Sequence, residues 1–216
     1  MSCKTSPHPE PFTFTKENEQ KAQDYINRYP KGREVSAIIP ILRLAQNQSG
    51  GWLPQAAIEF VAHYLSLPSI KVYEIATFYT MFNLKPVGKH LIQICRTTPC
   101  WLRGAVDLTK TCEAHLNVSK GDVTNDALFS YKEVECLGAC ANAPMVQIND
   151  DYYEDLTPDA LIEIIEELKK GNTPPPGSSM GRQGSSPQED PRLSKPTKPK
   201  KPRKSKESQP DVGQQR

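Results

Sequence analysis

The sequence predicts an α+β protein with two ordered domains and a tail, and three observations lead to this prediction. Apolar residues recur at helical spacing over residues 12–85. Short apolar runs of strand length alternate with helical segments over residues 88–170. The composition changes abruptly at residue 171, and hydrophobic residues make up only 37% of the chain. We therefore expect a small helical bundle at 12–85, an α/β domain at 88–170 and a disordered tail at 171–216.

The first domain is expected to contain four helices joined by short links, as in a small bundle. A polar helix is predicted within residues 15–30. A second helix, within residues 33–51, contains Pro40, which we expect to kink the helix or to mark a break in it. Two further helices are predicted within residues 53–68 and 69–82, and no alternating strand pattern interrupts them.

Large apolar side chains are unusually dense in the fourth predicted helix. They are Tyr73, Phe78, Tyr79, Met81 and Phe82. Helical spacing favours the core for about half of them. Their density leaves the others for a protein partner, since aromatic residues and Met are enriched at interfaces. The sequence does not decide between core and docking surface.

The second domain follows the order strand, helix, strand, strand, helix. Strands are predicted at residues 90–95, 128–136 and 144–150, with a helix at 101–116 after the first of them. Residues 151–156 add a further short strand after a turn. This order is typical of a thioredoxin-like α/β domain.

The closing helix has clear start and stop signals. Thr157 is a good N-cap, Pro158 suits the first helical position, and Gly171 suits the end. Apolar residues recur at helical spacing between these signals. We expect the ordered part of the chain to finish with this helix.

The tail is rich in proline and basic. Residues 171–216 contain 9 of the 20 prolines and almost no large apolar residues, a composition typical of disorder. Residues 181–216 contain 10 Lys and Arg against 4 Asp and Glu, so the overall charge of +2 combines a basic tail with a mildly acidic body. Because aromatic residues are not interleaved, we expect a solvated extension that binds no nucleic acid. A weak contact with a membrane surface or a neighbouring subunit is the alternative.

Four of the six cysteines form two close pairs. Cys95 and Cys100 enclose four residues, and Cys136 and Cys140 enclose three. Each pair begins where a predicted strand ends, so a sheet could deliver both loops to one edge. Four thiolates suit zinc or an iron–sulfur cluster, and paired spacing provides two thiolates for each iron of a [2Fe-2S] cluster. The spacing alone does not decide between cluster and zinc, and disulfides are the least favoured interpretation.

The other candidate groups are interpreted as structural or incidental. Cys112 lies in a predicted helix, where a buried thiol is the usual arrangement, and Cys3 lies in the N-terminal segment. The four histidines are scattered, so we assign none of them to a metal. No G-x-G-x-x-G follows a strand, so no dinucleotide site is expected, and no catalytic base–nucleophile set stands out. The sequence has no apolar run of about 20 residues and no secretory signal, so a reducing cytoplasm is the expected compartment.

One segment carries a family resemblance. The run from Asp126 to Pro144 fits D-x2-F-[ST]-x5-C-[LIVM]-G-x-C-x2-[GA]-P completely, and four other segments agree with it. These are QNQSGGWLP, VYEIATFYTMF, ICRTTPCWLRGA and INDDYYEDLTP. The sequence resembles the small [2Fe-2S] subunit in the peripheral arm of respiratory complex I, which is the E subunit of the bacterial enzyme, and its mitochondrial counterpart. The resemblance covers about residues 12–170.

The resemblance implies a helical domain followed by a thioredoxin-like ferredoxin domain. It implies that Cys95, Cys100, Cys136 and Cys140 ligate one [2Fe-2S] cluster. It also implies partners: a flavoprotein subunit that carries FMN and the NADH site, and other peripheral-arm subunits. The chain would then be one subunit of a proton-translocating NADH:quinone oxidoreductase, with no NADH or flavin site of its own.

The expected location is the cytoplasmic side of a bacterial inner membrane, which the chain would contact only through the complex. Two alternatives remain at this stage. An equivalent diaphorase subunit of an NAD-linked hydrogenase or formate dehydrogenase would keep the chemistry and change the complex. A zinc-stabilised interaction module would have no redox role.

Overall fold

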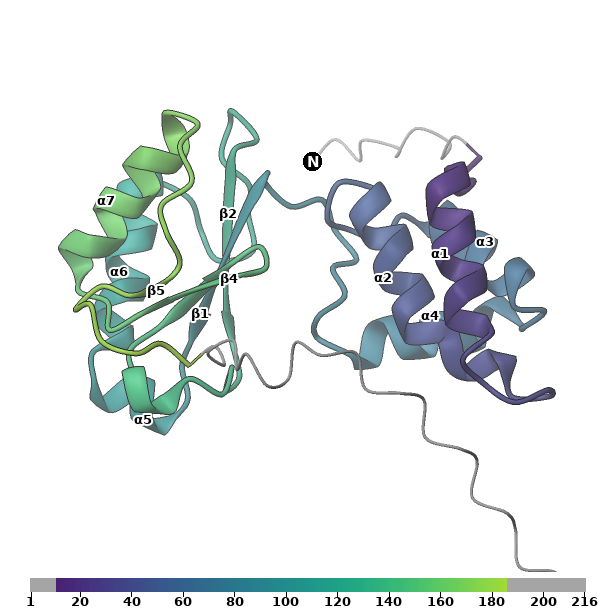
Figure 1. Cartoon of the computed structure of the whole chain (residues 1–216). Coiled ribbons are helices and arrows are strands. Elements are labelled where there is room, and N and C mark those ends of the chain that lie inside the picture. Colours follow the sequence, from purple (N-terminus) through teal and green to yellow (C-terminus); the bar gives the residue numbers. More distant parts are fainter. Residues whose placement is uncertain (1–10, 186–216) are drawn as a thin grey trace, which may run out of the picture. The chain divides into compact units, whose positions relative to one another are not determined.

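The computed structural model describes residues 11–185, in which a helical part precedes a mixed α/β part (Figure 1). Cys3, His8 and the predicted tail beyond Ser185 lie outside the described residues. The α+β fold class is confirmed. None of the helices within residues 11–185 is both long enough and apolar enough to cross a bilayer.

The helical part contains the four predicted helices and a short 3-10 turn. They are α1 (Lys16–Ile26), the 3-10 turn (Glu34–Ala37), α2 (Ile38–Gln48), α3 (Gln55–Tyr64) and α4 (Ser69–Phe78). The Thr15 hydroxyl caps α1 by accepting from the Asn18 backbone N–H at 3.3 Å. The core of this part consists of buried aliphatic side chains, among them Ile41, Leu42 and Val61, each 0% exposed. Burial of these faces holds the short helices together, because isolated helices of this length are only marginally stable.

Pro40 does not break α2, which runs continuously from Ile38 to Gln48. It is the third residue of the helix, and the change from 3-10 to α geometry falls between Ala37 and Ile38. The first four N–H groups of an α-helix have no acceptor within the helix, so the missing N–H of Pro40 costs no hydrogen bond. The expected interruption therefore lies just before the helix that contains this proline.

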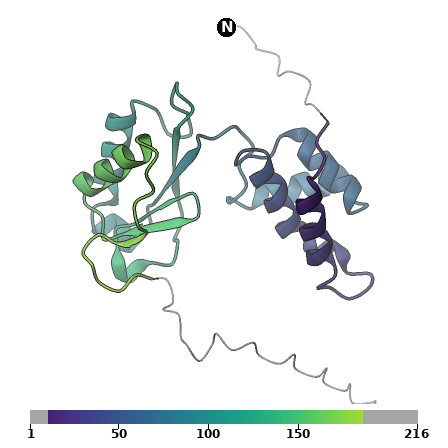
Figure 2. The same cartoon turned by 45° about the horizontal axis from the view of Figure 1, so that its top comes forward.

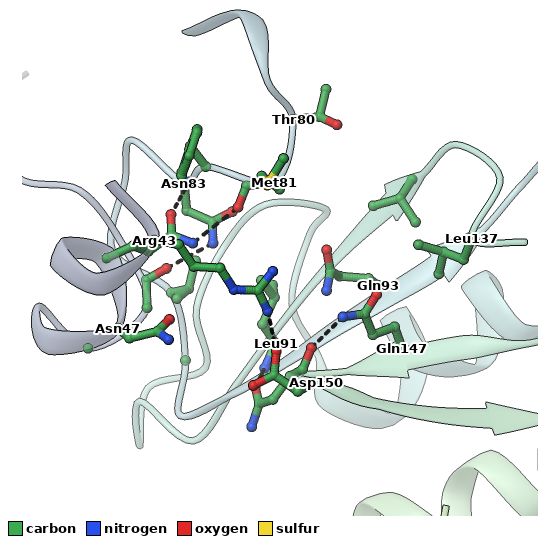
Figure 3. Close-up of a pocket in the computed structure, with 18 of the residues that line it drawn as sticks. Arg43, Asn47, Thr80, Met81, Asn83, Leu91, Gln93, Leu137, Gln147 and Asp150 are labelled. Carbon is green, nitrogen blue, oxygen red and sulfur yellow. Dashed lines mark hydrogen bonds and ion pairs between the residues drawn. The ribbon is translucent and has the colours of Figure 1, made fainter. Parts of the chain in front are cut away.

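The apolar residues at the end of α4 are mostly on the surface. The helix ends at Phe78, which is 75% exposed, and only Phe82 of the five is buried. The chain after α4 is also held by polar contacts: the Asn83 backbone N–H donates to Gln46 Oε1 at 2.8 Å, and Gln46 Nε2 donates to the Met81 carbonyl at 3.1 Å. Figure 3 shows Met81 and Asn83 close to each other. Four of the five residues are therefore available to a partner.

The α/β part is built on a five-stranded sheet with strand order β2-β1-β3-β4-β5. The strands are β1 (His90–Cys95), β2 (Phe129–Val134), β3 (Val146–Ile148), β4 (Asp151–Glu154) and β5 (Gly177–Ser178). β1 is parallel to β2 and antiparallel to β3, and β4 is antiparallel to β3 and parallel to β5. The helices are α5 (Thr98–Leu102), α6 (Ala105–Leu116) and α7 (Pro158–Lys169). A 3-10 turn at Cys140–Asn142 precedes β3.

Helices α6 and α7 lie side by side on one face of this sheet (Figures 1 and 2). Buried side chains of both helices, such as Leu108 and Ile165, pack in one cluster with Ile92, Phe129 and Tyr131 of the strands. The predicted start of the closing helix is present, since the Thr157 hydroxyl accepts from the Ala160 backbone N–H at 3.2 Å and Pro158 follows directly. This core fixes the strands whose ends carry the cysteine pairs.

The structure differs from the expected disorder between Gly171 and Ser185. β5 adds to the edge of the sheet with Gly177 opposite Tyr153 and Ser178 opposite Glu154. The one large apolar side chain of this segment, Met180, is 73% exposed, so the order of the segment comes from polar contacts with residues far back in the chain. Composition alone cannot reveal such contacts. The boundaries of the two domains, 12–85 and 88–170, stay predictions.

Candidate metal centre

The two cysteine pairs lie at the same end of two neighbouring parallel strands. Cys95 is the last residue of β1, and Cys136 follows the end of β2 by two residues. The register places Cys95 opposite Val134, so both strands end at one edge of the sheet. Cys100 and Cys140 lie in the loops that follow, in α5 and in the 3-10 turn. The sheet therefore delivers both loops to one place.

The two pairs differ in exposure. Cys95 and Cys100, the inner pair, are each 1% exposed. They pack with small or flexible apolar residues of the same region, namely Ala105, Ala139, Ala143 and Met145. Cys136 and Cys140, the outer pair, are exposed, and their Sγ atoms are 3.5 Å apart. None of these four thiols is in a disulfide.

Within the inner pair, one thiol is easier to ionise than the other. Burial opposes ionisation of Cys95, but the Thr97 hydroxyl, 3.3 Å from its Sγ, and the backbone N–H groups of Thr97 and Leu137 outweigh it, so the Cys95 pKa is lowered. Burial, followed by the hydrogen bond to Cys95, raises the pKa of Cys100 to about 12. A metal that binds this pair must displace the proton of Cys100.

In the outer pair, too, one thiol is easier to ionise than the other. The Gly138 backbone N–H lies 3.4 Å from Cys136 Sγ and is the main reason why the Cys136 pKa is lowered. Gly138 has a φ of 86°, a left-handed conformation that a residue with a Cβ rarely adopts. The neighbouring Cys136 raises the pKa of Cys140. The glycine of the C-L-G-A-C run thus allows the backbone conformation in which this N–H points to Cys136 Sγ.

The donor set fits a binuclear cluster. The two pairs are close enough to affect each other's ionisation. The Thr97 hydroxyl, which contacts Cys95, also lowers the pKa of Cys136, and the charge of Cys140 raises the pKa of Cys100. Across residues 11–185, no three or more His, Cys, Asp or Glu side chains gather closely enough for a single metal ion. Four thiolates in two pairs provide the two thiolates that each iron of a [2Fe-2S] cluster takes.

Sequence reasoning missed several residues that support the cysteine loops. Thr97 is only a spacer in the cysteine pattern, although its hydroxyl contacts Cys95. Tyr152 donates its hydroxyl to the Leu137 carbonyl at 2.9 Å and so ties the outer loop to β4. Asn142 is buried and receives its partners from β4 and from the segment after α7. An asparagine among the small residues of the A-N-A-P run was the available signal, since a buried amide needs partners.

Cys112 keeps the structural role expected from the sequence. It is 0% exposed within α6, and burial followed by the nearby Glu113 charge raises its pKa to about 12. Its thiol packs in the core that joins α6 and α7 to the sheet, away from the cysteine cluster of the two loops.

The family of thioredoxin-like [2Fe-2S] ferredoxins matches residues 22–169, which include all four cysteines of the two pairs. The chain belongs to this family. The match extends over the helical part as well as the sheet, so both parts of the described structure are family features.

Relatives of this chain are components of NADH-quinone oxidoreductase and of mitochondrial NADH dehydrogenase. The E subunit of the NADH-quinone oxidoreductase of Rickettsia bellii is 59% identical over 158 residues, which is 73% of this chain and 95% of that protein. The mitochondrial NADH dehydrogenase [ubiquinone] flavoprotein 2 of Dictyostelium discoideum is 44% identical over 187 residues, 86% of this chain and 76% of that protein.

A solved structure shares the fold. The crystal structure of an air-oxidized NAD+-reducing [NiFe]-hydrogenase superposes with a TM-score of 0.53 at 23% identity. The superposition covers 59% of this chain but only 22% of the hydrogenase chain, so the family fold is one section of a larger protein there.

Proposed function

We propose that this chain is the [2Fe-2S] electron-transfer subunit of the NADH dehydrogenase module of a respiratory NADH:quinone oxidoreductase. The observation that carries the proposal is the 59% identity to the Rickettsia bellii oxidoreductase component over 95% of that protein's length. It is supported by two cysteine pairs at one sheet edge, which is the donor set that such a cluster requires.

In this proposal the four cysteines ligate the cluster, and neighbouring residues adjust the properties of their sulfurs. Cys95 and Cys100 would hold one iron, and Cys136 and Cys140 the other. When bound, the cluster accepts and releases single electrons. The backbone N–H of Gly138 and the Thr97 hydroxyl point to the sulfurs of Cys136 and Cys95 and favour their thiolate forms. Hydrogen bonds of this kind to ligand sulfurs also set the reduction potential.

The location of the pairs determines how electrons would enter and leave. The inner pair is buried against Ala139, Ala143 and Met145, whereas the outer pair lies at the surface. The exposed side is therefore where a redox partner would approach. We assign that partner as the flavoprotein subunit that carries FMN and the NADH site, with which the cluster exchanges one electron while hydride transfer stays on the flavin.

The relatives are components of a multi-subunit oxidoreductase, and this chain is the peripheral electron-transfer component of such a complex. The proposal places it on the cytoplasmic side of the inner membrane, held there by the other peripheral-arm subunits. The exposed residues Tyr73, Phe78, Tyr79 and Met81 give it an apolar surface that a neighbouring subunit could cover.

The test is metal analysis of the full chain, purified anaerobically, with matched cysteine variants. The native chain should contain about two irons and two sulfides and give an EPR signal after dithionite reduction. Cys95→Ala and Cys136→Ala should each lose this signal, because one iron loses a thiolate. Cys112→Ala, at the buried cysteine of α6, should retain both irons. Stoichiometric zinc without an EPR signal, or a full binuclear spectrum in Cys95→Ala, would refute the assignment.

A further inference from the structure

Residues 177–185 reach back over the loop that contains Cys140, and we call them the C-terminal clasp. We propose that the clasp fixes the orientation of Cys140 toward the cluster and that Arg182 is its positioning residue. The inference rests on the proposed function, because it takes Cys140 as a cluster ligand. It assigns a role in the metal centre to a segment that lies about forty residues further along the chain.

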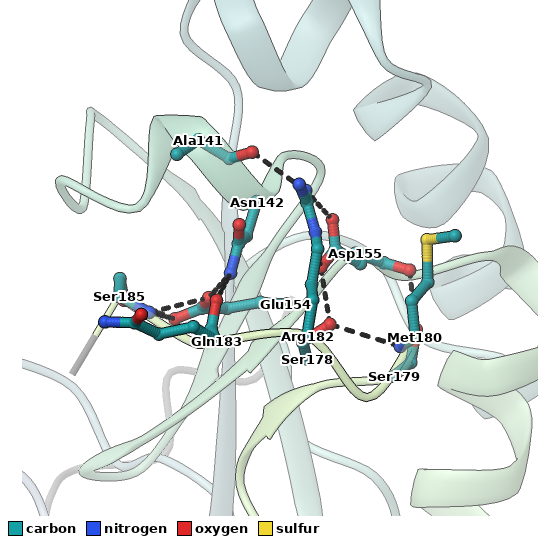
Figure 4. Close-up of polar contacts among 10 residues, drawn as sticks. All are labelled: Ala141, Asn142, Glu154, Asp155, Ser178, Ser179, Met180, Arg182, Gln183 and Ser185. Carbon is teal, nitrogen blue, oxygen red and sulfur yellow. Dashed lines mark hydrogen bonds and ion pairs between the residues drawn. The ribbon is translucent and has the colours of Figure 1, made fainter. Parts of the chain in front are cut away.

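Arg182 joins the sheet to the cysteine loop (Figure 4). Its Nε donates to Asp155 Oδ2 at 2.8 Å, and its Nη2 donates to the Ala141 carbonyl at 2.8 Å and also to Asp155 Oδ1. Ala141 directly follows Cys140, and the Asp155 side chain is only 2% exposed. The planar guanidinium therefore spans a fixed carboxylate at the end of β4 and the backbone of the 3-10 turn.

A second set of contacts holds the next residue of the same turn. Asn142 Nδ2 donates to Glu154 Oε2 and to the Gln183 carbonyl, both at 2.7 Å. Glu154 is 1% exposed, and it accepts from the Ser185 backbone N–H at 3.0 and 3.1 Å (Figure 4). Asn142 and Glu154 are thus buried polar groups whose partners come largely from the clasp, and a buried polar group is costly to leave unpaired.

Without the clasp, the turn would be less firmly held. The backbone bonds that remain are one inside the turn, from the Asn142 N–H to the Ala139 carbonyl at 3.0 Å, and one from the Asp155 N–H to the Asn142 carbonyl at 2.8 Å. The carbonyl of Ala141, next to Cys140, has Arg182 as its partner. The direction of the Cys140 side chain therefore depends on a contact that the clasp supplies.

The consequence for the cluster follows from how outer partners act on ligands. Residues that orient a ligand typically change metal affinity or activity by about 10–100-fold when they are mutated. A rotated Cys140 would also change the hydrogen bonds around the outer sulfurs, and these bonds contribute to the reduction potential. If β5 only covered the edge of the sheet, loss of the clasp would lower the thermal stability and leave the cluster unchanged. Edge covering and orientation of Cys140 can therefore be separated experimentally.

The experiment uses the full chain carrying its cluster and compares Arg182→Ala and Arg182→Lys with Arg28→Ala. Arg28 stacks over the Tyr25 ring at 4.7 Å in the helical part and serves as the matched arginine control. We measure the rate of iron loss to a chelator, the EPR spectrum and midpoint potential of the reduced cluster, and thermal unfolding by circular dichroism. Arg182→Ala should lose iron about tenfold faster or more, with an altered EPR spectrum and potential. Arg182→Lys keeps a positive charge for Asp155 but lacks the planar fork of donors by which Arg182 reaches both Asp155 and the Ala141 carbonyl, so it should be intermediate.

The outcomes separate the clasp from the proposed function. If the native chain contains no [2Fe-2S] cluster, the proposed function fails, and the role of the clasp fails with it. If the native chain contains the cluster and Arg182→Ala matches Arg28→Ala in iron loss, EPR spectrum and potential, only the clasp is refuted. Lower thermal stability with an unchanged spectrum and potential refutes it equally, because that result shows edge capping alone. If Arg182→Ala does not fold, the same comparisons on Arg182→Lys decide.

Discussion

Gly88 lies just before β1, and its replacement by alanine should separate the two strands that present the cysteine pairs. Gly88 is buried, and a Cβ at this position would lie 2.7 Å from Phe129 Cα and 2.8 Å from the Phe129 backbone nitrogen. Both atoms belong to the backbone of β2, so no side chain can rotate away to make room. Relief requires the backbone of one strand to move.

The expected cost combines two effects. Forcing an extra carbon into a packed interior costs about 1–3 kcal/mol. The Gly88 N–H also donates to the Ser130 hydroxyl at 3.0 Å in the interior, and loss of this bond costs about 1 kcal/mol. We therefore expect Gly88→Ala to lower the free energy of unfolding by about 2–4 kcal/mol, which corresponds to about 4–16 °C in Tm for a chain of this size.

Gly184→Ala provides the matched control. A Cβ at Gly184 meets its nearest atoms at 3.7–3.9 Å, an ordinary contact distance. The substitution also reduces the freedom of the unfolded chain, so a change between zero and a gain of about 1 kcal/mol is expected. Thermal unfolding of both variants is followed by circular dichroism at equal cluster content. A Gly88→Ala variant as stable as Gly184→Ala would refute the steric reasoning.

Two further predictions concern the end of β4 and the closing helix. The hydrogen bond from Arg182 holds the pKa of Asp155 below its usual range despite burial. The ionised Asp155 therefore stabilises the folded chain at every pH above about 3.9, the pKa of an aspartate in the unfolded chain. This stabilisation is lost as the pH falls through the lower pKa of Asp155 in the folded chain. Asparagine tolerates the φ of 55° at this position, and Asp155→Asn should lower the free energy of unfolding by about 1–3 kcal/mol at pH 7. In urea titrations, the difference in free energy of unfolding between the native chain and the variant should shrink below about pH 4. A difference that does not depend on pH would contradict this prediction. Thr157→Ala removes the N-cap of α7 and should cost about 1 kcal/mol in the same urea assay, and an unchanged midpoint would show that the cap contributes nothing.

The part of the site that the sequence could show is the part encoded locally. The spacing of Cys95 with Cys100 and of Cys136 with Cys140 places each pair within one loop, and the strand signals before the loops explain why the loops meet. Helix α7 could be predicted for the same reason, because Thr157 and its neighbours mark the start of the helix within a few residues. Such signals depend on sequence neighbours, so one sequence suffices to read them.

The features that the sequence could not show depend on distant partners. Arg182 lies in a stretch whose composition is typical of disorder, and its order depends on Asp155, 27 residues earlier, and on the Ala141 carbonyl, 41 residues earlier. The apolar residues around α4 were ambiguous for a different reason. Helical spacing predicts which side chains are buried after Phe78 only if the helix continues there. The helix ends at Phe78, and Tyr79 takes an extended conformation with a ψ of 113°.

The exposure difference between the cysteine pairs has a consequence for handling the protein in air. Oxidants and chelators in solvent meet Cys136 and Cys140 first, and the two Sγ atoms are only 3.5 Å apart. In a chain without its cluster, an oxidant that removes two electrons and two protons would join these thiols in a disulfide, while the buried Cys95 and Cys100 stay reduced. Such a chain would be lighter by two hydrogens and would resist cluster insertion until a reductant reopened the bond. Damage by air would thus begin at the two exposed cysteines, and a reductant would reverse it there.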